Sequence, residues 1–290
     1  VTAGAPDTLV FHPGGALGDF VLTWPLLRSL RGLGRRVEVV SADSRARLAR
    51  RVLGVGSRPD HLPPWTGLWA GMTPPTSEFE AVTLVLAFGE RPEPWRRALA
   101  TLCPRAVLEV VEGTLDRPLA LELGRRFGVA ATHGPRAGNR GGPVLLHAGA
   151  GSPDKCWPLE GWIELARGLR GRGISPELRA GEVEAERWGR ERTDRFLGAG
   201  GRFLTSLEEL VECVQAARAV ASGDTGPGHL AAQLGLPTLT LFGPTDPARW
   251  RPIGPCSSVL SAPGSRLEGL RSDQVLSALD ALLSASETLA

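Results

Sequence analysis

Three short loops rich in glycine hold most of the side chains in this chain that could take part in chemistry. The first loop contains Gly14, Gly15 and Gly18 and ends at Asp19. Glycines after a strand let the backbone approach a ligand closely. Asp19 could serve such a site, or it could only stabilise the positive end of a helix that begins here, and both roles stay open. The spacing Gly-Gly-x-x-Gly, with no acidic residue closing the next strand, disfavours an NAD site.

The second loop, over residues 147–158, carries Lys155, the only lysine of the chain. Every other basic residue is an arginine, which we interpret as coding bias, so most arginines need no functional explanation. An ammonium group in a turn of small residues could neutralise a phosphate, and a solvated loop cation is the alternative. Trp157 could cover a base or a ribose, although an aromatic ring in such a place more often only packs.

The third loop lies between a strand and a helix and reads Ser-Gly-Asp-Thr-Gly-Pro-Gly-His over residues 222–229. Free backbone N–H groups and the positive end of the helix dipole converge at such a point, which suits a diphosphate. Thr225 can donate a hydroxyl, His229 an imidazole, and Asp224 can orient a neighbouring N–H or accept from a sugar hydroxyl. A capped helix start with a histidine facing the core is the alternative.

The elements that must position these loops alternate between strand and helix, which predicts an α/β fold with parallel sheets. A stretch rich in glycine and arginine at 133–142 separates two such runs, so we expect two domains, 1–136 and 137–290, with the terminal helix free to pack back on the first. Ligands of open parallel sheets bind outside the carboxyl ends of the strands, where the three loops lie. The expected strands are 8–12, 36–40, 82–88, 106–110, 144–147, 177–179, 219–222 and 238–242. The expected helices are 19–33, with a kink at Pro25, 44–53, 93–102, 115–127, 159–172, 182–196, 228–234 and 272–284. We also expect a loop over 54–76 and a further element over 206–216.

Composition excludes several classes of protein. The chain has 290 residues, of which 42% are apolar, and a net charge of +2, values typical of a globular protein with a sizeable core. No apolar run approaches the roughly 20 residues that cross a bilayer, and the first residues lack the pattern of an export signal. The four cysteines form no C-x-x-C pair, which disfavours a zinc ribbon or a disulfide scaffold. The first half is moderately basic, which favours an anionic partner but is too weak a signal for nucleic acid.

Taken together, the loops resemble glycosyltransferase family 9, the ADP-heptose:lipopolysaccharide heptosyltransferases and their relatives. The resemblance implies a GT-B fold, in which two Rossmann-like domains with parallel sheets face an interdomain cleft. It also implies that the first domain binds an acceptor, that the second binds a nucleotide sugar, and that transfer inverts the anomeric carbon without a metal or cofactor. The matching segments, in chain order, are Leu17-Gly18-Asp19 with Pro25-Leu26-Leu27, Lys155-x-Trp157-Pro158 before Trp162, Gly181 with an acidic run, Asp224-Thr-Gly-x-x-His229, and Phe242-Gly-Pro-Thr-Asp-Pro247.

The resemblance also implies roles for single residues. Asp19 would be the catalytic base, and the loop with Gly14, Gly15 and Gly18 would face the acceptor. A family glutamate that holds the ribose falls among Glu182, Glu184 and Glu186; we favour Glu184, with Trp157 beside the nucleoside. The donor sugar and its diphosphate would contact Ser152, Lys155, Asp224, Thr225, Gly226, Gly228 and His229.

This sequence departs from the family where Gly149 and Ala150 replace threonines that face the phosphates, and its first half is short. The sugar, the nucleotide base and the acceptor therefore stay open: the donor would be ADP-heptose or another nucleotide-diphosphate sugar, and the acceptor a glycolipid or a saccharide. We expect a cytoplasmic transferase, with contact at the cytoplasmic face of the inner membrane as an option. The basic helix that contains Arg45, Arg47, Arg50 and Arg51 could face an anionic leaflet, or it could equally be exposed to solvent. The alternative is a homologue that binds a nucleotide sugar without transferring it.

Overall fold

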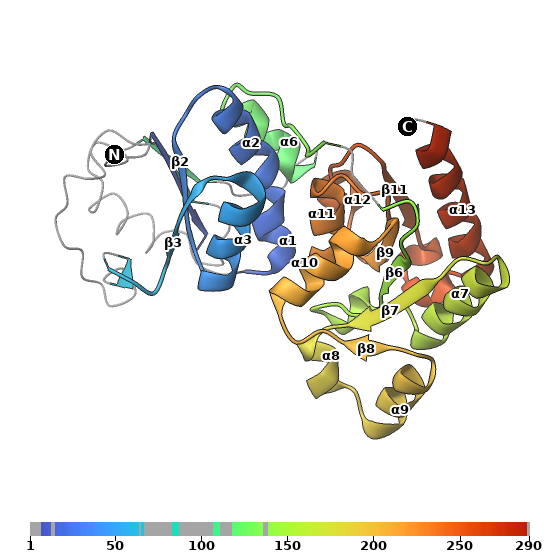
Figure 1. Ribbon diagram of the computed structural model, residues 1–290. Coiled ribbons are helices and arrows are strands. Elements are labelled where there is room, and N and C mark those ends of the chain that lie inside the picture. Colours follow the sequence, from blue (N-terminus) through green and yellow to red (C-terminus); the bar gives the residue numbers. More distant parts are fainter. Residues whose placement is uncertain are drawn as a thin grey trace. The chain divides into compact units, whose positions relative to one another are not determined.

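The computed structural model describes residues 7–12, 15–63, 65–66, 83–86, 107–110, 118–135 and 139–288, with the backbone alone at 83–86 and 107–110. The chain divides into two compact units: residues 1–115 with 120–132, and residues 116–119 with 133–290 (Figure 1). Each unit contains one sheet, whose described strand pairs are all parallel. The predicted α/β class with parallel sheets is therefore confirmed. The domain boundary expected after residue 136 stays a prediction.

The sheet of the first unit has the strand order β3-β2-β1-β4-β5. Its central strand β1 is fully buried from Thr8 to His12, because it is paired on both sides and its side chains are mostly apolar. The strands are β1 (Thr8–His12), β2 (Val37–Ser41), β3 (Gly56–Pro59), β4 (Thr83–Leu86) and β5 (Val107–Val110), and the helices described before residue 130 are α1 (Leu17–Leu22), α2 (Trp24–Gly32), α3 (Asp43–Leu53) and α6 (Leu119–Arg126). The predicted helix at 93–102 lies outside the described residues.

Two expectations for this unit were wrong. The stretch 54–76, taken as a loop, contains β3, an edge strand whose residues Gly-Ser-Arg-Pro show no apolar pattern and which is defined only by its pairing with β2. The single helix expected over 19–33 is two helices that meet at Thr23, whose hydroxyl donates to Phe20 O at 2.7 Å. Pro25 does not kink a helix, because it stands in the first turn of α2, where its missing N–H costs nothing.

The sheet of the second unit has the order β11-β10-β9-β6-β7-β8, with α7 and α13 side by side on one face and α10 and α11 on the other (Figure 1). The edge strands β8 and β11 were not expected. The strands are β6 (Val144–His147), β7 (Pro176–Ala180), β8 (Arg202–Phe203), β9 (Ala219–Gly223), β10 (Thr238–Phe242) and β11 (Ser257–Ser261); the α-helices are α7 (Leu159–Gly171), α8 (Glu182–Arg187), α9 (Arg190–Gly198), α10 (Leu207–Ala216), α11 (Gly226–Gln233), α12 (Pro247–Trp250) and α13 (Ser272–Thr288); and the 3₁₀ turns are η2 (Pro153–Lys155), η3 (Pro263–Ser265) and η4 (Leu267–Gly269).

The helix expected over 182–196 is also two helices, α8 and α9, separated at Trp188 and Gly189. The Trp188 ring turns into the core and lies 5.2 Å from the ring of Phe196 and 5.9 Å from that of Phe203, between ring centroids. Burial of this aromatic cluster stabilises the break between the two helices. Within the described part of the chain, no helix is both long and apolar enough to cross a membrane.

Candidate functional site

The loops that follow β6, β7 and β9 lie at one edge of the second sheet. These three strands are neighbours, β9 and β7 pairing on either side of β6 in parallel. Because the carboxyl ends of parallel strands meet at the same edge, the segments that carry Lys155, Glu184 and Asp224 begin at a common edge although they are far apart in sequence.

The ion pair of Lys155 with Asp224 is the centre of this edge. Lys155 Nζ donates to Asp224 Oδ2 at 2.9 Å, and His229 Nε2 lies 3.4 Å from Asp224 Oδ1. Asp224 and His229 are each 5% exposed, whereas Lys155 is 32% exposed. Burial by itself raises the pKa of Asp224, but the hydrogen bond from His229 and the charge of Lys155 outweigh burial and lower this pKa below its usual value. A buried carboxylate therefore holds an ammonium group at the surface and an imidazole beneath it.

Close packing fixes the backbone around this ion pair. A Cβ atom at Gly223 would lie 2.9 Å from the backbone atom Lys155 O, so this position needs glycine. A Cβ atom at Gly228 would lie 2.5 Å from Ser222 Oγ, so this side chain would have to move. The Thr225 hydroxyl donates to Gly223 O at 3.3 Å and Thr225 is the N-cap of α11. The first backbone N–H groups of α11 and the positive end of its dipole accordingly lie at the same edge as the Lys155 ammonium.

Glu184 connects the loop after β6 with the start of α8. Its side chain is buried, Oε1 accepting from Ala150 N and Oε2 from Gly181 N, each at 3.1 Å. Glu182 and Glu186 are exposed, which separates Glu184 from the other two glutamates that sequence left as candidates. A Cβ atom at Gly149 would lie 2.2 Å from Glu184 Oε2, so the glycine leaves room for this carboxylate.

Two further residues hold the same loop and were not singled out from sequence. His147 at the end of β6 is buried, its Nδ1 lies 3.3 Å from Gly149 O, and burial lowers the pKa of His147 to about 4. Arg187 donates to Gly151 O at 3.2 Å. The sequence held no signal for either residue, because a histidine in a strand and an arginine in a charged helix are both common.

Ser152 and Trp157 lie on either side of Lys155. Ser152 O accepts from Lys155 N at 3.1 Å, so this residue shapes the turn that presents the lysine. Trp157 is 1% exposed; its Nε1 donates to Leu270 O at 3.0 Å, and its ring centroid lies 5.0 Å from that of Trp162. The structure therefore shows the packing role that was left open for Trp157, and its contact with the nucleoside stays a prediction.

Asp19 in the first unit stands in the first turn of α1, and its Oδ2 accepts from Ala16 N at 3.1 Å. This is the helix-stabilising role, and it occupies one carboxylate oxygen. Gly15 has a φ of +78°, which favours glycine, and Gly18 is buried in the first turn of α1. Gly14 lies outside the described residues.

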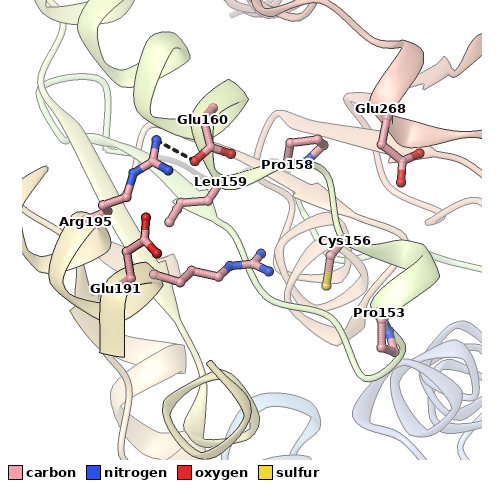
Figure 2. A pocket seen from close by; sticks show the side chains of 9 residues that line it. Pro153, Cys156, Pro158, Leu159, Glu160, Glu191, Arg195 and Glu268 are labelled. Atoms are coloured by element: carbon pink, nitrogen blue, oxygen red, sulfur yellow. Dashed lines mark ion pairs between the residues drawn. The ribbon is translucent and has the colours of Figure 1, made fainter. Parts of the chain in front are cut away.

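A pocket of about 450 Å³ adjoins the loop that carries Lys155 (Figure 2). Glu160 and Arg195 form an ion pair across it at 2.7 Å between Oε1 and Nη2. Its three carboxylates outnumber its two guanidinium groups, so this pocket does not suit a diphosphate. It is lined by Pro153, Cys156, Pro158, Leu159, Glu160, Glu191, Arg192, Arg195 and Glu268.

Among the residues that the structure describes, no three His, Cys, Asp or Glu side chains are grouped so that they could hold a metal ion. The expected absence of a metal and of a cofactor stays a prediction.

Comparison with known proteins places this geometry in a family. The family model described as glycosyltransferase family 9 (heptosyltransferase) matches residues 119–276, which include the Lys155, Glu184 and Asp224 loops. Lipopolysaccharide heptosyltransferase 1 of Escherichia coli K12 is 36% identical over 139 residues, 48% of this chain and 43% of that enzyme. The enzyme of the same name from Pseudomonas aeruginosa is 43% identical over 110 residues, 36% of this chain and 29% of that enzyme. The chain thus aligns with less than half the length of these relatives.

Solved structures resemble the whole chain. The E. coli heptosyltransferase WaaC with ADP has a TM-score of 0.70 at 20% identity, covering 95% of this chain and 100% of that one. A family 9 glycosyltransferase of Veillonella parvula has a TM-score of 0.71 at 14% identity, covering 98% of this chain and 100% of that one. At such identities the likeness shows the fold, and it confirms the predicted GT-B class. By the match of its family model over more than half its length, the chain belongs to glycosyltransferase family 9.

Proposed function

We propose that the chain transfers a sugar from a nucleotide-diphosphate sugar, with ADP-heptose as the first candidate donor, to a glycolipid or saccharide acceptor, with inversion and without a metal or cofactor. The observation that carries this proposal is the Lys155–Asp224–His229 cluster beside the first turn of α11. The names of the relatives, heptosyltransferases with ADP in one solved structure, support the choice of donor.

The donor diphosphate is the group that gains charge as the bond to the sugar breaks. Lys155 and the N–H groups of α11 are positive features fixed in advance, which is the arrangement that stabilises developing negative charge most effectively. Asp224 keeps Lys155 in place, and Lys155 is the member of the pair that a ligand can reach, because its side chain is 32% exposed and that of Asp224 is 5% exposed. Ser152, Thr225, Gly226 and Gly228 complete the proposed contacts with the diphosphate and the sugar.

Glu184 is the proposed partner of the ribose. Each of its oxygens accepts one backbone hydrogen bond, from Ala150 N and from Gly181 N, and each retains a further lone pair that a ribose hydroxyl can use. Glu182 would lie at the rim of such a site, since it is exposed in the same turn.

Asp19 is the proposed base. Its Oδ2 is engaged with Ala16 N, so Oδ1 is the oxygen that would take the proton from the acceptor hydroxyl. The acceptor oxygen then bonds to the anomeric carbon while the bond from that carbon to the diphosphate oxygen breaks, its electron pair leaving with the diphosphate. A single displacement of this kind inverts the anomeric carbon. The basic helix α3 supports an anionic acceptor, and contact with the cytoplasmic face of the inner membrane is part of the proposal.

A donor screen with a matched pair of variants tests this function. ADP-heptose, UDP-sugars and GDP-sugars are titrated against the wild-type chain by calorimetry, and transfer to mixed lipid and saccharide acceptors is followed by mass spectrometry. We expect Asp19→Asn to retain donor affinity and to lose about 10²- to 10⁴-fold in turnover, because only proton removal is affected. Asp43→Asn, in the first turn of α3, is the control and should keep wild-type turnover. Donor binding without any turnover in the wild type would favour a homologue that only binds nucleotide sugars.

A further inference from the structure

A cluster of charged groups surrounds the first loop, at the carboxyl ends of β1, β2 and β3. Arg45, in the first turns of α3, donates from Nη2 to Gly15 O at 2.5 Å. The next backbone N–H, that of Ala16, donates to Asp19 Oδ2 at 3.1 Å. Gly15 O and Ala16 N belong to the same peptide group, so one rigid plane joins the Arg45 guanidinium to the Asp19 carboxylate.

Two opposite charges at the ends of one peptide group reinforce each other. The guanidinium withdraws electron density from the carbonyl and thereby strengthens the N–H as a donor to the carboxylate, since hydrogen bonds in a chain polarise one another. The arrangement also fixes the direction of the peptide plane, because its C=O and N–H point to opposite sides. Rotation of this plane would break both hydrogen bonds together.

This peptide group has particular need of an anchor. Gly15 has a φ of +78°, and a Cβ atom there would lie 3.2 Å from Asp19 Oδ2 and 3.5 Å from His12 Cε1. The position therefore suits glycine, and glycine is the residue whose backbone has the most alternative conformations. A hydrogen bond from a charged side chain selects one of them.

Arg45 is itself held by its surroundings. Burial lowers the pKa of Arg45, and the charges of Asp19 and Asp60 oppose that shift. Asp60 follows β3, is 9% exposed, and donates its backbone N–H to Ser41 O at 2.9 Å. His12 at the end of β1 is fully buried, and burial together with the charge of Arg45 lowers the pKa of His12 to about 4, so it adds no positive charge near neutral pH. The charges of two carboxylates thus act on Arg45: Asp60, which is buried, and Asp19, at the proposed reaction centre.

We propose that Arg45 is a positioning residue for Asp19, which it holds through the Gly15–Ala16 peptide group so that the second carboxylate oxygen faces the acceptor hydroxyl. This role rests on the base function proposed above for Asp19. Arg45 acts on the direction of the carboxylate and not on the donor, whose proposed ligands belong to the second unit. Misplacement of a catalytic group by about 1 Å can cost about 10²-fold in rate.

The test compares Arg45→Ala, Arg45→Lys and the control Arg35→Ala, an exposed arginine that precedes β2 in the same unit. We expect Arg45→Ala to lower kcat about 10- to 100-fold with the Kd for the donor unchanged within twofold. Arg45→Lys keeps a positive donor of shorter reach, so its kcat should lie between that of Arg45→Ala and that of the wild type. An equal loss in Arg35→Ala, or a loss of donor binding together with kcat, would overturn the positioning role.

A double-mutant cycle distinguishes positioning from general destabilisation. In an Asp19→Asn background, Arg45→Ala should not lower the residual rate further, whereas its effect on the melting temperature should persist. Additive losses in rate would contradict the proposal.

A third measurement does not depend on activity. The Ala16 amide should exchange its hydrogen faster in Arg45→Ala and, more mildly, in Arg45→Lys, as seen by NMR. If the wild type shows no transfer, the proposed function fails while this measurement still decides whether Arg45 holds the loop. An unchanged exchange rate in both variants would refute the Arg45 contact itself.

Discussion

Lys155 is held at the surface by a carboxylate that is almost wholly buried. The distance of 2.9 Å between Lys155 Nζ and Asp224 Oδ2 leaves the ammonium anchored on one side and exposed on the other. The backbone of Lys155 is confined as well, because a Cβ atom added at Gly223 would lie only 2.9 Å from Lys155 O. A compact point charge fits this corner better than a planar fork of five donors.

Lys155→Arg is therefore expected to weaken binding of ADP, the probe for the donor diphosphate, by about tenfold despite the retained charge. Isothermal titration calorimetry with ADP measures this change. Arg172→Lys, at an exposed ion pair with Asp280, is the control for an exchange of the two cations and should bind ADP as the wild type does. Wild-type affinity in Lys155→Arg would mean that the single lysine of the chain reflects coding bias alone.

At the scale of elements, the loop after β6 and the start of α8 behave as one piece because Glu184 accepts hydrogen bonds from both. Arg187 adds a contact from α8 to Gly151 O. A Cβ atom at position 149 would lie 2.2 Å from Glu184 Oε2, so the glycine there allows the carboxylate to reach Ala150 N.

Gly149→Ala should displace the Glu184 carboxylate and leave the Ala150 N–H without its acceptor. We expect a lower melting temperature and an ADP affinity reduced several-fold, because an unsatisfied buried donor costs about 1–3 kcal/mol. Gly151→Ala is the matched control in the same loop, since a Cβ atom there has no described neighbour within 4 Å. Equal effects of the two substitutions would argue against a role for Glu184 in shaping the loop.

Whole elements also show which parts of a fold a sequence pattern can predict. The strands 8–12, 144–147 and 238–242 have the predicted bounds, because apolar runs flanked by loop residues mark buried parallel strands. The edge strands β3, β8 and β11 were missed, since their partners define them and apolar periodicity does not. Each of the helices predicted over 19–33 and 182–196 is two helices in the structure. The sequence pattern continues across Thr23 and across Trp188, although the backbone turns there.

At the scale of the molecule, each of the two units contains a buried histidine at the carboxyl end of a central strand. Burial lowers the pKa of His12 in the first unit and of His147 in the second to about 4, from an ordinary value of 6.5. Between these two pH values the unfolded chain binds protons that the folded chain does not, so stability is fully present above about pH 6.5 and is lost as the pH falls toward 4. Both units should share this sensitivity.

Lowering the pH from 7 to 5 should therefore destabilise the protein, with a limiting loss of about 3 kcal/mol for each histidine if the pH falls below 4. Chemical denaturation at several pH values measures this. His147→Gln should be less stable at pH 7 but show a shallower dependence on pH, whereas His133→Gln, at an exposed position, should keep the wild-type dependence. A wild-type slope in His147→Gln would show that this histidine does not titrate as its burial implies.

The sequence by itself determined the alternation of strands and helices, the glycine loops that follow the strands, and the residues Asp19, Lys155, Asp224 and His229 within those loops. These features are local, since periodicity, glycine and helix starts act over a few neighbouring residues. Tertiary structure alone decided that Glu184 is the buried glutamate, that Trp157 belongs to the core, and that Arg45 reaches Gly15. These contacts join residues such as Ala150 and Glu184, 34 positions apart, or Gly15 and Arg45, 30 positions apart. Such a contact forms only where neighbouring strands bring a distant backbone group close to the side chain. No local sequence pattern carries that information.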